Sequence, residues 1–76
     1  MNQESVMELR GLIHSKYKSV SDLARALRWA RQKLQLISNG NQVPNVLEVA
    51  ELAKALGKSI EDMAVVFLEM HGAEVW

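Results

Sequence analysis

Apolar side chains recur three or four residues apart along this chain, and no stretch alternates for long enough to form a strand. The pattern predicts an all-α fold in which residues 1–76 make one domain. The expected helices cover about residues 5–16, 19–27, 30–39, 45–57 and 59–70.

Residues that favour helix ends flank several of these segments. Ser19, Asn45 and Ser59 each have an acidic residue three positions later, which is the spacing of a capping box or its shorter-acid variant. Gly40 and Gly57 stand where a left-handed residue ends a helix. We therefore expect short helices joined by tight connections.

The segment about 19–40 has the spacing of a helix-turn-helix, two helices that cross at a steep angle. Ala24 supplies the small residue that a close crossing requires. The apolar residues that pin the two helices to the core are Leu27, Trp29, Leu34 and Ile37. The outward face of the second helix is polar and carries Arg31, Gln32, Lys33, Gln35 and Asn39. Arg and Gln side chains suit bidentate contacts with guanine and adenine edges.

The formal net charge is zero, but the charges are unevenly distributed. Residues 1–42 carry seven basic and three acidic side chains, a net charge of +4. Residues 43–76 carry two basic and six acidic side chains, a net charge of −4. One half of the chain could therefore face a polyanion while the other faces away or toward a partner.

The order and spacing of the apolar, small and capping residues resemble the Cro and phage-repressor family of helix-turn-helix domains, also called the XRE type. The matching residues are Leu9, Leu12, Ser19, Leu23, Ala24, Leu27, Leu34, Ile37, Asn39, Gly40, Pro44, Leu52, Ala53, Ala55, Leu56, Gly57, Ser59 and Ile60. The resemblance covers about residues 8–68. It implies a compact five-helix bundle of the phage-repressor DNA-binding-domain type, with the helix-turn-helix at the second and third helices.

The resemblance also implies binding to double-stranded DNA as a homodimer, with the helix about 30–39 in the major groove. Positions early in this helix read bases in the family, which maps onto Arg31 and Gln32, and Gln35 lies one turn further on the same side. Positions that hold phosphates in the family map onto Ser19 and Ser21. Further candidate phosphate contacts, from their position, charge or polarity, are Lys18, Arg28, Lys33 and Asn39.

The sequence departs from the family at several places, among them the turn, the start of the second helix and the loop after the third. The turn position usually filled by Gly holds Arg28, where a left-handed backbone would cost about 1 kcal/mol or more. Either the turn is built differently, or Arg28 accepts that strain to point at a phosphate. Val20 replaces a frequent Gln, and the loop about 41–43, often basic, is uncharged. Fewer phosphate contacts imply a shallower dependence of binding on salt.

The segment about 59–70 is more apolar than one helix face requires. Phe67 and Leu68 are expected to close the core. The remaining residues Val65, Val66 and Met70 are then either exposed to solvent without a specific role or part of a dimer interface. A patch this apolar in a small chain favours the interface.

The sequence contains no cysteine, no Gly-rich phosphate loop and no carboxylate cluster flanked by a base, so we expect no enzyme activity and no cofactor. His14 and His71 are isolated, which argues against a metal site. No apolar run is long enough to span a membrane, and we expect a cytoplasmic, nucleoid-associated protein without a small-molecule substrate.

Two functions stay open. The first is a small transcriptional regulator of the repressor or Cro-like type, from a phage or prophage. The alternative is a protein-interaction module on the same fold, similar to an antitoxin or anti-repressor, with weak or no DNA binding. The neutral net charge and the acidic, apolar C-terminal half favour the alternative.

Overall fold

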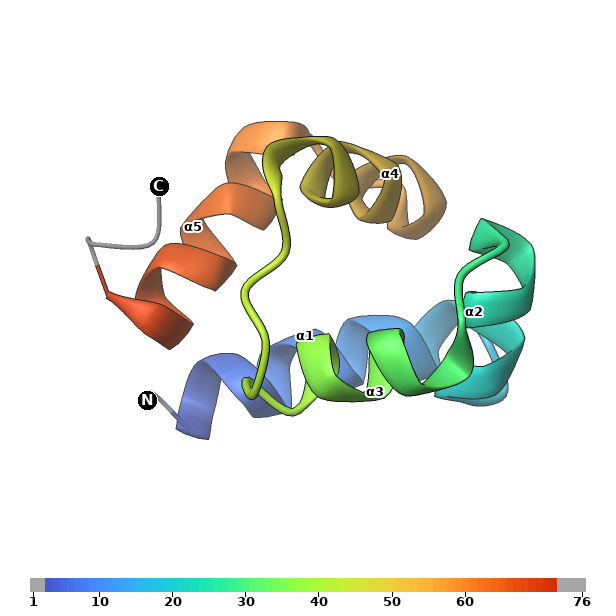
Figure 1. Ribbon diagram of the computed structural model, residues 1–76. Coiled ribbons are helices and arrows are strands. Elements are labelled where there is room, and N and C mark those ends of the chain that lie inside the picture. The colour runs from blue at the N-terminus through green and yellow to red at the C-terminus, as the bar shows by residue number, and fades with distance from the viewer. Residues whose placement is uncertain (1–2, 73–76) are drawn as a thin grey trace.

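The computed structural model describes residues 3–72, which form five helices and no strand (Figure 1). The helices are α1 (Gln3–Lys16), α2 (Val20–Leu27), α3 (Arg31–Ser38), α4 (Val46–Leu56) and α5 (Ile60–His71). The prediction of a compact all-α arrangement is confirmed for this part of the chain. The predicted boundaries differ from the observed ones by one or two residues, chiefly because capping residues lie outside the helices that they cap.

Side-chain caps account for the starts of α2, α4 and α5. The Oγ atoms of Ser19 and Ser59 each accept a hydrogen bond from the backbone amide three residues later, at 3.2 and 3.0 Å. Asn45 and Glu48 form a complete capping box, in which each side chain accepts a 2.8 Å bond from the other residue's amide. Each cap satisfies an amide that the helix itself leaves unpaired.

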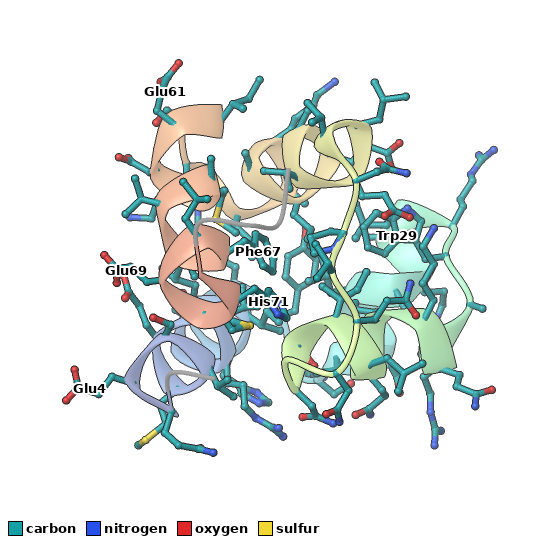
Figure 2. The ribbon with its side chains drawn as sticks, turned by 60° about the vertical axis from the view of Figure 1, so that its left-hand side comes forward. Glu4, Trp29, Glu61, Phe67, Glu69 and His71 are labelled. Carbon is teal, nitrogen blue, oxygen red and sulfur yellow. The ribbon has the colours of Figure 1, made fainter. Side chains whose placement is uncertain are left out.

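All five helices contribute apolar side chains to one core. Phe67 of α5 is fully buried and points into the interior (Figure 2). Around it lie mainly aliphatic side chains, among them Leu9, Ile13, Leu23, Leu34, Ile37, Leu52, Leu56, Met63 and Met70. α5 packs on α1 and α4, while α2 packs on α3 and α4, and residues 39–45 cross from α3 to α4 (Figure 1). No helix within residues 3–72 combines the length and apolarity needed to cross a membrane.

The outer surface of α5 differs from the sequence prediction. Val66 and Met70 are only 6% and 1% exposed, so two of the three predicted dimer-interface residues belong to the core instead. They lie four residues apart on the same side of the helix as Phe67, where α5 meets its neighbours. Val65 is 50% exposed, and Leu68, expected to close the core, is 37% exposed.

Candidate nucleic-acid interface

The connection between α2 and α3 is built around Arg28 in the left-handed conformation, with φ 61° and ψ 35°. The Arg28 amide donates to the Arg25 carbonyl at 3.2 Å, and the Trp29 amide donates to the Ala24 carbonyl at 2.9 Å. Among residues 3–72, no other non-glycine residue has a positive φ. The turn therefore keeps the geometry that usually takes glycine, and Arg28 bears a conformational cost of about 1–2 kcal/mol.

The start of α3 presents polar groups to solvent. Arg31 and Gln32 are its first two residues and are both exposed. Ala30, the N-cap, offers no side-chain acceptor to the first amides of the helix. Gln35, one turn further along, is half-buried, and Leu36 is 36% exposed. The first turn of α3 thus carries exposed donors and a helix N-terminus without a side-chain cap.

The start of α2 lies beside that of α3. A shallow depression between the two helices is lined by Ser21, Ala24, Arg25, Trp29 and Arg31. The fold therefore brings Ser21 and Arg31 together and adds Arg25, which sequence reasoning did not select. Arg25 follows Ser21 by four residues, a spacing on one helix face that could have indicated it.

The cations around this depression are only weakly engaged within the protein. The Arg25 guanidinium makes an ion pair with Asp22 at 3.1 Å, but the Arg25 side chain is 78% exposed. An exposed pair of this kind contributes little to stability and gives way readily to another anion. Lys18 and Arg28 are also exposed, whereas Ser19 is half-buried and its Oγ is occupied as a helix cap.

Lys33 is held against α4 and is not a free surface cation. Its Nζ makes an ion pair with the Glu48 carboxylate and lies 4.7 Å from the centroid of the Trp29 ring. The Trp29 indole N–H donates in turn to Glu51 Oε2 at 2.9 Å. We call these four residues the Trp29–Lys33 network. Because Lys33 pairs with Glu48, it links α3 to α4, and its assignment as a phosphate contact stays a prediction that this ion pair disfavours.

The charged state of Glu48 follows from its surroundings. Burial of the carboxyl group acts to raise its pKa, but hydrogen bonds from Lys33 and from the Asn45 amide, together with the Lys33 charge, outweigh burial. The pKa of Glu48 is consequently lowered. The carboxylate stays ionised at neutral pH and holds both the start of α4 and the Lys33 ammonium.

At the other end of α3, Asn39 is the C-cap residue and is half-buried. Its side-chain oxygen accepts a hydrogen bond from the Arg10 guanidinium of α1. Nothing in the local sequence indicates this contact, because the two residues are 29 positions apart. The fold therefore places another basic side chain beside α3, at the end away from Arg31.

Within residues 3–72, no group of three or more His, Asp or Glu side chains is arranged to hold a metal ion. What the fold and this surface define is a small all-helical protein with basic and polar side chains gathered on its second and third helices. No protein-family model, curated protein or solved structure matches the chain.

Proposed function

We propose that the chain is a sequence-specific DNA-binding regulator in which α2 and α3 form a helix-turn-helix of the phage-repressor type. One observation carries the proposal. A three-residue connection through left-handed Arg28 joins α2 to α3 and leaves Arg31 and Gln32 exposed at the start of α3. An exposed, polar helix start beside basic side chains is the form that a recognition helix takes in this motif.

In this function α3 enters the major groove. Arg31 is suited to a guanine edge and Gln32 to an adenine edge, and Gln35 reaches the next base pairs along the helix. Lys18, Ser21 and Arg28 contact phosphates, and Arg25 joins them by exchanging Asp22 for a phosphate oxygen. These contacts orient α3 on the duplex.

The Trp29–Lys33 network supports α3 on the side that faces α4. It couples the first turns of α3 to α4 through Glu48 and Glu51, so the recognition helix is held at one angle to the body of the protein. Since Lys33 is neutralised there, it adds nothing to counterion release. We expect a shallow dependence of affinity on salt, with about 0.9 of a logarithmic unit for each phosphate neutralised.

Reading a two-fold operator requires two copies of the chain. With Val66 and Met70 buried, Val65 stays exposed as a predicted dimer contact, and an apolar strip on α5 and α4 offers further surface. Val46, Val49, Ile60 and Ala64 line a depression there, and Leu68 continues the strip one turn along α5. In the proposed function the homodimer acts on the nucleoid, in the cytoplasm, without a cofactor or a catalytic group.

The test is selection from a pool of random duplex DNA at low salt, followed by affinity measurements on the enriched sequence. We expect enrichment of a two-fold site. Arg31→Ala should lower the affinity by about ten- to a hundredfold and relax the preference at one base pair. Lys54→Ala is the matched control, because it removes one positive charge from α4, outside the interface. Absence of enrichment, or equal effects of the two substitutions, would refute the proposal.

A protein-interaction module on the same fold is the second candidate. The neutralisation of Lys33 by Glu48 favours it, because this contact removes one cation from the surface that would face DNA. A failed selection combined with an unaltered fold would leave this candidate as the better one.

A further inference from the structure

A groove of about 310 Å³ lies between α1 and α5, and none of its lining residues belongs to α2 or α3. Leu12 of α1 and Val65 and Val66 of α5 supply apolar surface to it, with Met63 beneath. Val65 is 50% exposed, so apolar surface remains open to solvent here. The groove therefore has room and a suitable lining for an aliphatic side chain.

The same groove is bordered by an excess of negative charge. Glu8 of α1 and Asp62 and Glu69 of α5 line it, against the single cation Lys58. Among the described residues none of these three carboxylates forms an ion pair, although Glu69 accepts a 3.4 Å hydrogen bond from the Ser5 hydroxyl. Figure 2 shows Glu69 and Glu61 projecting from α5 on the side away from Trp29. Unpaired carboxylates around apolar surface favour a cationic, amphipathic ligand.

We propose that the α1–α5 groove binds a basic segment of another protein, which places an aliphatic side chain on Val65 and its Lys or Arg side chains against Glu8, Asp62 and Glu69. Aliphatic stems of Lys and Arg can cover the valine surface while their charged ends reach the carboxylates. Nucleic acid is excluded as the ligand, because its phosphates would meet three carboxylates.

A second copy of this chain fits the groove less well. The exposed cations Lys18, Arg28 and Arg31 lie around the α2–α3 depression, where Trp29 is half-buried and the most exposed aliphatic side chain of α3, Leu36, is only 36% exposed. A basic segment with an aliphatic side chain of its own complements both the carboxylates at the edge of the groove and the apolar surface within it. This inference does not depend on DNA binding, and the two surfaces can be occupied at the same time.

The probe is a synthetic helical peptide of about 14 residues, with leucines on one face and lysines elsewhere. Two control peptides of the same length, here called twins, change one property each: in the first, glutamate replaces lysine, and in the second, serine replaces leucine. Binding is followed by amide chemical shifts of the full, isotope-labelled chain. We expect the lysine–leucine peptide to shift resonances of α1 and α5 around the groove, and both twins to bind at least about tenfold more weakly.

Four variants distinguish binding in the groove from nonspecific effects of net charge and of exposed apolar surface. Glu8→Lys and Val65→Ser should each weaken binding of the peptide by about three- to tenfold. Their matched controls are Glu61→Lys, the same charge reversal on α5 outside the groove, and Leu47→Ser, an aliphatic side chain that is 74% exposed on α4. Both controls should stay within about twofold of the unaltered chain.

Three outcomes would overturn the proposal: equal effects of Glu8→Lys and Glu61→Lys, shifts centred on α2 and α3 or on the apolar strip of α4 and α5, or self-association through the groove without peptide. Arg31→Ala keeps this test distinct from the test of DNA binding. It should leave binding of the peptide unchanged whether or not the chain binds DNA.

Discussion

The α2–α3 and α4–α5 connections share one backbone geometry but differ in sequence. Each has three residues, 28–30 in the first and 57–59 in the second. Arg28 has φ 61° and ψ 35°, and Gly57 has φ 70° and ψ 31°. In both, the next amide donates to a carbonyl in the last turn at 2.9 Å, from Trp29 in the first and Lys58 in the second. The same backbone geometry therefore occurs in both connections, which we call the first joint (residues 28–30) and the second joint (residues 57–59).

The second joint uses the residues that this geometry favours. Gly57 takes the left-handed conformation without a Cβ penalty, and Ser59 caps α5 with its hydroxyl. The first joint has Arg28 at the left-handed position and Ala30 at the uncapped start of α3. Its sequence gives up about 1–2 kcal/mol of conformational energy and about 1 kcal/mol of capping. That loss falls at the surface for which we propose DNA binding, a common place for tolerated strain.

The largest effect on stability should come from making the second joint resemble the first. Gly57→Ala should destabilise the fold by about 1–2 kcal/mol, because alanine resists a positive φ. The new Cβ would lie 2.7 Å from Lys16 Nζ, the end of a flexible side chain that can move aside. Urea denaturation measures the change. Gly11→Ala, in open space within α1, is the control and should stabilise by about 0.5–1 kcal/mol. Two changes of the same sign would contradict the backbone argument.

Removing the cap of the second joint should have the next largest effect. Ser59→Ala deletes the hydroxyl that accepts the Asp62 amide, and we expect a loss of about 1 kcal/mol in the free energy of unfolding. Thermal and urea unfolding provide the measurement. Ser15→Ala is the control, since the Ser15 hydroxyl is exposed and donates to a carbonyl within α1 without capping it. If both serines cost the same, the cap is not the cause.

Relieving the first joint should raise stability by a smaller amount. Arg28→Gly removes the strain but makes the unfolded chain more flexible, so the net gain should be about 0.5–1 kcal/mol. If Arg28 contacts a phosphate, the slope of DNA affinity against salt should fall by about one unit. Arg28→Ala separates the two roles, because it removes the charge and keeps the positive φ. Stabilisation by alanine equal to that by glycine would show that Arg28 is not strained.

The smallest effect concerns the support that α4 gives to the first joint. Because the pKa of Glu48 is lowered in the folded chain, its contribution to stability is present above the ordinary value of 4.5 and is lost as pH falls through the lowered value. Glu48→Gln should therefore cost about 0.5 kcal/mol near neutral pH and progressively less below pH 4.5. Urea denaturation at several pH values tests this. A cost that stays constant on acidification would argue against the charged pair with Lys33.

Local sequence determined the number of helices and most of their ends. Capping residues act on amides and carbonyls within one turn, so their effect can be inferred without knowledge of the fold. Here they are the N-caps Ser19, Asn45 and Ser59 and the C-cap Gly57. The same holds for the exposure of Arg31 and Gln32, which follows from the spacing of the buried residues on α3.

Tertiary packing decided what each remaining side chain does. In the sequence Lys33 looks available and Trp29 looks like a core residue, but α4 brings Glu48 to Lys33 and Glu51 to Trp29 from 15 and 22 residues away. Val66 and Met70 are buried and Ile60 is exposed, although all three are apolar, because the arc of α5 that is covered depends on where α1 and α4 pack. Local patterns specify a helix and its ends, whereas the partner of a side chain depends on segments that only the folded chain brings together.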